Sequence, residues 1–245
     1  MRAVQAIFMK QLADLPKNIS ITIMYILFPA LGLLFSTLMG GPDEYGFDQG
    51  PIMVVQFTMT FVGMVPLITI ANTIAEDNEY KSLRFLVTAG VKPFQYLAGL
   101  IGFVMIMAVI VLGIFALMGG FTGTNLVIFF AFGLLGVLAS SVLGAIVGIF
   151  SKNVQQCSAI YTPLMMVLAF APFISMFSET VAQVAQFAFT FQIFAALVNL
   201  IMELPYGSEP LFDVTLIQSA IIIAVNGLIF AVLFAVAYRK KGLRG

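Results

Sequence analysis

The sequence contains few charged residues, and their scarcity excludes a water-soluble fold. Only 9% of its 245 residues are charged and 61% are hydrophobic, whereas about 25% of the residues of a typical soluble domain are charged. The formal net charge is zero, so the balance of charge does not indicate a nucleic-acid partner, and none is expected. This composition is typical of a protein whose main solvent is lipid.

Several reactive residue types are absent or nearly absent. The sequence has no histidine and no tryptophan, and its single cysteine is Cys157, which excludes an internal disulfide and argues against a metal site. It also has no Gly-x-x-x-x-Gly-Lys-Ser/Thr phosphate loop and no Gly-x-Ser-x-Gly nucleophile motif. Hydrolysis of ATP by this chain is therefore excluded, and an intramembrane enzyme has little support. We expect neither a catalytic residue nor a cofactor bound by the chain itself.

Long apolar stretches are what the sequence has in quantity. A helix satisfies its own backbone hydrogen bonds and crosses a bilayer with about 20 apolar residues. Six stretches meet this length: residues 19–39, 52–75, 95–118, 125–150, 158–177 and 214–238. Pro163 and Pro172 predict kinks in the fifth of them. The expected fold is an all-α polytopic membrane protein with one transmembrane domain over residues 1–245.

Two further segments are helical in pattern but do not cross. In residues 1–17 the apolar side chains recur at helical spacing and polar side chains fill the remaining arc, which predicts an interfacial amphipathic helix rather than a cleaved leader. That helix is either a basic anchor on anionic headgroups or an elbow that transmits force into the first span. Residues 179–213 carry glutamines, Asn199, Glu203 and Pro205, and predict an extracellular re-entrant or interfacial segment.

The basic residues fix the expected orientation. With six spans and both termini in the cytoplasm, all 11 Lys and Arg fall in cytoplasmic segments, as the positive-inside rule requires. A seventh span would place the basic C-terminal tail opposite the basic N-terminus. We therefore predict six crossings with both ends in the cytoplasm.

Residues 76–92, between the second and third spans, are the most informative loop. Its acidic residues precede its basic ones, an order that complements the dipole of a short helix. The residues that we single out are Glu76, Asp77, Glu79, Tyr80, Lys81, Leu83 and Arg84. A solvated loop with a capped helix would have the same composition. Elsewhere, Gly144 and Gly148 have Gly-x-x-x-Gly spacing and predict close helix packing, within the chain or across a dimer.

The same loop carries a resemblance to a known family. An acidic pair after a span, the run Phe85-Leu86-Val87, Thr88-Ala89-Gly90-Val91-Lys92-Pro93 and then Tyr96-Leu97-Ala98-Gly99 opening the next span resemble permease subunits of type-2 ABC exporters. The motif covers about 25 residues, whereas the order of the predicted helices resembles the family over nearly the whole chain.

The resemblance implies partners and roles that composition does not show. It implies a separate ABC ATP-binding subunit, which holds ATP and Mg and docks on the loop at residues 76–92. It also implies a homodimer, or a heterodimer with a similar permease, in contact with membrane lipids in a bacterial cytoplasmic membrane. In such permeases the segment before the last span closes the outer end of the path, so Phe187, Phe191 and Phe194 are candidates for an extracellular gate. An interfacial helix anchored by aromatic residues is the alternative.

The membrane-embedded residues suggest the kind of cargo. The spans have no ionisable side chain at mid-depth, which argues against an ion-driven secondary transporter. With 25 Phe and 14 Met, the spans offer soft, adaptable surfaces, although most of these side chains pack the bundle or face lipid. We expect export of a hydrophobic or amphiphilic substrate, such as a peptide or bacteriocin, a drug or a lipid. A membrane binding or immunity protein that transports nothing is the alternative.

Overall fold

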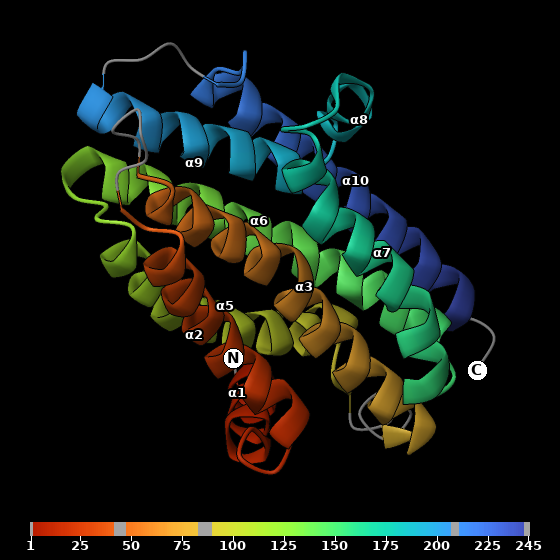
Figure 1. Cartoon of the computed structure of the whole chain (residues 1–245). Coiled ribbons are helices and arrows are strands. Elements are labelled where there is room, and N and C mark those ends of the chain that lie inside the picture. The colour runs from red at the N-terminus through yellow and green to blue at the C-terminus, as the bar shows by residue number, and fades with distance from the viewer. Residues whose placement is uncertain (1, 42–47, 83–89, 207–210, 243–245) are drawn as a thin grey trace.

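The structure is a computed structural model that describes residues 2–41, 48–82, 90–206 and 211–242. Within these ranges the chain forms nine α-helices and no strand. The helices are α1 (Arg2–Asp14), α2 (Ile19–Leu38), α3 (Gly50–Glu79), α5 (Pro93–Met118), α6 (Gly123–Phe150), α7 (Val154–Ile174), α8 (Glu179–Ala185), α9 (Phe189–Tyr206) and α10 (Leu216–Gly242). They form one bundle, with α1 at one end and α8 and α9 toward the other (Figure 1).

Six of these helices are long and apolar enough to cross a membrane: α2, α3, α5, α6, α7 and α10. The predicted all-α fold with six spans is therefore confirmed, although several helix bounds differ from the predicted ones, most of all in α3, α7 and α10. Helix α3 continues to Glu79, so the acidic residues that we assigned to a loop lie on its last turn. Helix α7 begins at Val154 and continues through Pro163 and Pro172 to Ile174. Proline is tolerated within membrane helices because neighbouring helices and side chains satisfy the backbone groups that it leaves free.

Helix α3 is the central element of the bundle. Its most apolar window is 72% buried, against 11% for α10, and it packs on α2, α5, α6, α7 and α9. Figure 1 shows α3 crossing the middle of the molecule between α2, α6 and α7. Helix α3 therefore contacts most of the other spans directly.

Helix α1 is amphipathic, as predicted, and its apolar face packs on α5. The side chain of Ile7 is buried, and the Phe8 ring meets Phe103 edge-on with ring centroids 6.4 Å apart. Close approach depends on Gly99, because a Cβ there would stand 2.8 Å from the Cβ of Ile7 and 3.0 Å from a backbone oxygen of α1. The helix is thus docked against the spans, which favours an elbow over an anchor held by lipid alone.

Helices α8 and α9 form the segment before the last span, and they are bent by 115° relative to each other. Helix α9 is not an interfacial helix with one wet side, since almost every side chain from Phe189 to Leu200 is buried. It packs on α3, α6, α7 and α10. Helix α9 is therefore part of the packed interior of the bundle.

Candidate functional site

The candidate site is the C-terminal end of α3, where the predicted coupling residues begin. The carboxylate of Asp77 is buried there and receives two hydrogen bonds from other helices. The hydroxyl of Tyr96 on α5 donates one at 2.5 Å, and the ammonium of Lys10 on α1 donates the other at 3.2 Å. Asp77 therefore joins α1, α3 and α5, and its side chain is not free to contact a partner protein.

The next two residues brace the turn between α6 and α7. The amide of Asn78 donates to the backbone oxygens of Gly148 and Ser151, each at 3.2 Å, and so holds the end of α6. The carboxylate of Glu79 accepts the backbone N–H of Val154 at 3.2 Å, at the N-terminus of α7, where the helix dipole favours an anion. The last turn of α3 is thus tied to α1, α5, α6 and α7.

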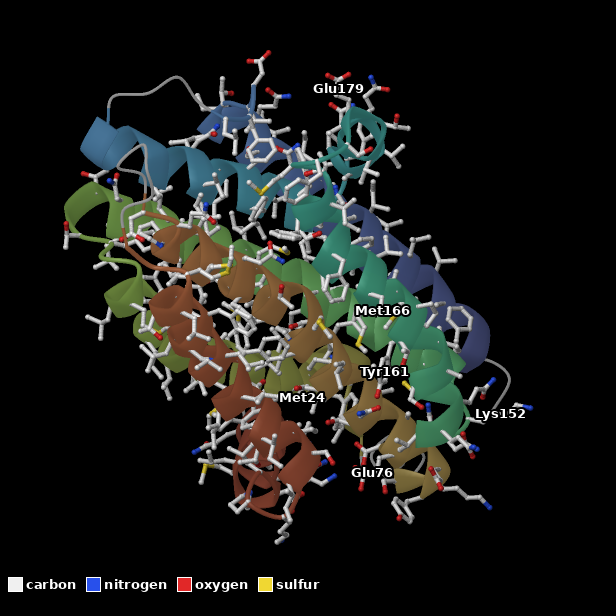
Figure 2. All side chains as sticks on the ribbon, viewed as in Figure 1. Met24, Glu76, Lys152, Tyr161, Met166 and Glu179 are labelled. Atoms are coloured by element: carbon white, nitrogen blue, oxygen red, sulfur yellow. The ribbon has the colours of Figure 1, made fainter. Side chains whose placement is uncertain are left out.

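Four of the predicted coupling residues remain exposed on this braced turn. They are Glu76, Glu79, Tyr80 and Lys81, and Tyr80 is 73% exposed. Lys81 stops the helix with a φ of 60°, in the left-handed region that glycine usually occupies after a helix. Figure 2 shows Glu76 at the same end of the molecule as Lys152, and Glu179 at the opposite end. Leu83 and Arg84 lie outside the described residues.

The structure separates the three phenylalanines that we predicted as a gate. The Phe187 side chain is 68% exposed, whereas Phe191 and Phe194 are buried. The latter two pack edge-on against Phe212, with ring centroids 5.5 and 5.9 Å apart. Asn199 fixes Phe212 by a pair of backbone hydrogen bonds, donating to its oxygen at 2.8 Å and accepting from its N–H at 3.1 Å. Phe191 and Phe194 therefore form one buried aromatic cluster with Phe212, and Phe187 is exposed.

Gly144 and Gly148 face α3 of the same chain. A Cβ at Gly144 would stand 2.4 Å from the backbone oxygen of Leu67, and one at Gly148 would stand 2.8 Å from that of Ala71. The spacing that left both intrachain and dimer packing open thus corresponds, in this structure, to direct contact between the backbones of α3 and α6.

Several polar side chains lie inside the spans, mostly where α3 meets its neighbours. The amide of Gln56 donates to the backbone oxygen of Ala169 on α7 at 3.4 Å, and the amide of Asn72 donates to the Tyr161 hydroxyl at 3.4 Å. Among the described residues, the side-chain oxygens of Gln56, Asn72, Ser141 and Thr190 are buried and have no hydrogen-bond partner. Such groups are costly in hydrocarbon, so they mark places where bound molecules or a second conformation would gain hydrogen bonds.

Sequence reasoning missed Lys10, Asn78 and Tyr96 as parts of this site. A signal for Asp77 was present: with the helix continued past residue 75, Asp77 falls one turn after Thr73 and two after Ile70, on the buried face. No comparable signal identified its partners, because they come from distant segments. Among the described residues, no group of three or more metal-ligating side chains lies together.

The comparison with protein families identifies the family of the chain. A family model described as an ABC-2 family transporter protein matches residues 2–236. A search of curated proteins finds no match to the chain. Because the family match extends over nearly all of the sequence and all six spans, the chain belongs to the ABC-2 family of transporter proteins.

Proposed function

We propose that the chain works as an exporter and that the exposed residues at the end of α3 receive the movement of its ATP-binding subunit. Family membership supports a membrane permease subunit whose partner is an ABC ATP-binding subunit carrying ATP and Mg. The proposed contact surface is Glu76, Tyr80 and Lys81, with Glu79 beside them. We name these four residues the docking surface.

The observation that carries this proposal is the bracing of the last turn of α3. The same turn presents exposed side chains outward and ties α1, α5 and the α6–α7 turn together through Asp77, Asn78 and Glu79. A force applied to Tyr80 therefore reaches most of the bundle without first deforming a flexible loop. This geometry supports mechanical coupling better than it supports a passive solvated loop.

The orientation and location belong to the same proposal. The docking surface lies at the end of the bundle that carries α1, Lys81 and Lys152, and the positive-inside rule places such an end in the cytoplasm. An ATP-binding subunit then has access to it. We assign the chain to a bacterial cytoplasmic membrane with both termini in the cytoplasm.

At the opposite end, we propose that Phe191, Phe194 and Phe212 form an outer gate. Helix α9 is packed inside the bundle there and contacts α3, so displacement of α3 loosens the aromatic cluster. Phe187, although exposed, remains a candidate for contact with cargo as it leaves. The scarcity of charge in the spans and their apolar surfaces support a hydrophobic or amphiphilic cargo, such as a peptide, a drug or a lipid.

We further propose that two permeases, identical or similar, assemble with two ATP-binding subunits. The half-buried amides of Gln56 and Asn72 lie where α3 meets α7. Their oxygens, which have no partner within the described ranges, are candidates for the lining of a path that two copies enclose. The six spans are few for a complete translocation path, which also supports a dimer.

Co-purification tests the docking surface. The permease is co-expressed with candidate ABC ATP-binding subunits, purified in mild detergent and assayed for bound ATPase activity, for the wild type and for a Glu76→Lys, Tyr80→Ala double variant. We expect the wild type to retain an ATPase and the variant to lose it, while Glu179→Lys, a charge reversal at the opposite end, retains it. Because both altered side chains are exposed, the monomer fold is expected to survive.

The alternative outcome is equally informative. If a folded wild type retains no ATPase with any of the subunits, the chain is better described as a membrane binding or immunity protein. If the double variant retains as much ATPase as the wild type, the docking surface lies elsewhere.

A further inference from the structure

A cleft of about 570 Å³ lies where α1, the start of α2 and the end of α3 meet. Its volume falls within the range of about 300–1,000 Å³ that is typical of ligand sites. Its lining includes the exposed side chains of Lys10, Lys17 and Glu76, which define its mouth, and the buried side chains of Thr69 and Phe103. Thr69 lies seven residues before Glu76, or about 10 Å further along the helix. The cleft therefore runs from the charged end of the bundle into the level of the spans.

The mouth of the cleft carries both basic and acidic side chains, and not all of them are in ion pairs. Lys10 is bound to Asp77, and Lys17 is bound to Asp14 at 3.1 Å. Glu76 is exposed and makes no ion pair with any described residue. The Lys17 side chain is 75% exposed and keeps donors free beyond its bond to Asp14. The mouth thus suits a ligand that presents an ammonium group beside a phosphate.

An apolar surface continues from the cleft along α2. Ile19 is part of the lining, and Ile19, Ile23 and Ile26 are 66%, 51% and 65% exposed. The spacing of four and three residues places them on one face of the helix. A hydrocarbon chain that leaves the cleft past Ile19 therefore has a continuous apolar track parallel to α2, in the direction that a lipid tail takes.

We infer that this cleft binds the headgroup of a zwitterionic aminophospholipid from the adjacent leaflet, with its ammonium on Glu76, its phosphate on Lys17 and one acyl chain along the α2 track. A purely anionic headgroup meets Glu76 and Asp14 and is disfavoured. The bound lipid bridges α1, α2 and α3 and holds the elbow against the central helix. The inference does not depend on the identity of the cargo or on the ATP-binding subunit. The Glu76 carboxylate has two oxygens, so one can accept from the lipid ammonium while the other contacts the ATP-binding subunit.

Native mass spectrometry of the purified, delipidated permease alone tests the site. Phosphatidylethanolamine and phosphatidylglycerol with identical acyl chains are titrated separately, and the retained lipids are counted for the wild type, Glu76→Gln and Glu179→Gln. We expect one tight phosphatidylethanolamine per chain in the wild type. Loss of one charge-assisted hydrogen bond weakens this binding about tenfold in Glu76→Gln, whereas Glu179→Gln binds as the wild type does.

Two other results would overturn the inference. Equal binding of phosphatidylglycerol and phosphatidylethanolamine, unaffected by Glu76→Gln, would show that the cleft does not recognise a zwitterion. Glycerophosphoethanolamine, which has the headgroup without acyl chains, provides a separate arm. If it displaces the lipid at an equal concentration, the ligand is a soluble zwitterion and the α2 track contributes nothing. Ile19→Ser, a change at an exposed position, is expected to weaken binding of the lipid but not of this soluble headgroup.

Discussion

The Tyr96 hydroxyl donates a 2.5 Å hydrogen bond to the buried carboxylate of Asp77, joining the start of α5 to the end of α3. This contact gives Asp77 a role inside the permease, whereas the sequence assigned it, like Glu76, to contact with a partner. Asp77 stands within a run of acidic residues and was predicted to meet an ATP-binding subunit, but it is occupied inside the permease. Glu76, its neighbour, is exposed. Variants of the two adjacent acids are therefore expected to fail in different ways.

Replacing Tyr96 by Phe is expected to destabilise the fold. The substitution keeps the ring and removes the donor, and a hydrogen bond to a charged group contributes about 1.5–3 kcal/mol. Unfolding of the purified permease in mixed micelles measures the loss. Tyr80→Phe is the matched control, because the Tyr80 ring is 73% exposed, and it is expected to unfold as the wild type does. Equal stability of Tyr96→Phe and the wild type would show that Asp77 does not depend on this bond.

Of two Asn→Asp substitutions, one is expected to destabilise the fold and the other to be nearly neutral. Asn78 donates to two backbone oxygens, so Asn78→Asp replaces a donor with a negative charge beside two acceptors. Asn153 instead accepts the Gln156 N–H at 2.8 Å as the N-cap of α7, a role that Asp fills as well as Asn. Thermal unfolding is expected to show a lower midpoint for Asn78→Asp and little change for Asn153→Asp. Similar losses in both variants would contradict the assignment of Asn78 as a brace.

The sequence predicted the spans because their signal is local. Each of the six apolar stretches is long enough by itself to require a helix, and no partner need be known. The end of α3 shows where local reasoning stops. Charge marks a span boundary in a hydropathy pattern, yet the helix continues to Glu79 because its last turn is held by groups from α1, α5 and α7.

The burial of α9 illustrates the same limit. The glutamines and Asn199 within residues 179–213 predicted an interfacial or re-entrant segment, since polar side chains usually remain in contact with water. In the structure the two of these residues that lie on α9 are satisfied internally: Asn199 binds the backbone of Phe212, and Gln192 accepts from Ser219 at 2.8 Å. Which phenylalanines pack and which are exposed depends on these partners, 13 to 27 residues away in the sequence. Helical spacing alone could not distinguish Phe187 from Phe191.

Alanine at Gly144 is expected to force α3 and α6 apart. The added Cβ would stand 2.4 Å from a backbone oxygen that cannot rotate away, and overpacking of this kind costs about 1–3 kcal/mol. Gly227→Ala on α10 is the matched control, because a Cβ there meets its nearest neighbour at 3.9 Å. Since Ala is a better helix former by about 1 kcal/mol, the control is expected to unfold at the same or a higher denaturant concentration. A neutral Gly144→Ala would show that this close contact is absent in the membrane.

Removal of two buried hydroxyls is expected to change stability in opposite directions. The Thr190 hydroxyl on α9 is fully buried and has no hydrogen-bond partner in the part of the chain that the structure describes, so Thr190→Val keeps the shape and removes an unpaired polar group. The Ser219 hydroxyl, equally buried, donates to Gln192 at 2.8 Å, so Ser219→Ala leaves that amide oxygen unsatisfied, at a cost of about 1–3 kcal/mol. Unfolding of both variants in the same micelles makes the comparison. If Thr190→Val destabilises as much as Ser219→Ala does, Thr190 has a partner in the working assembly, such as water or cargo between α9 and α3.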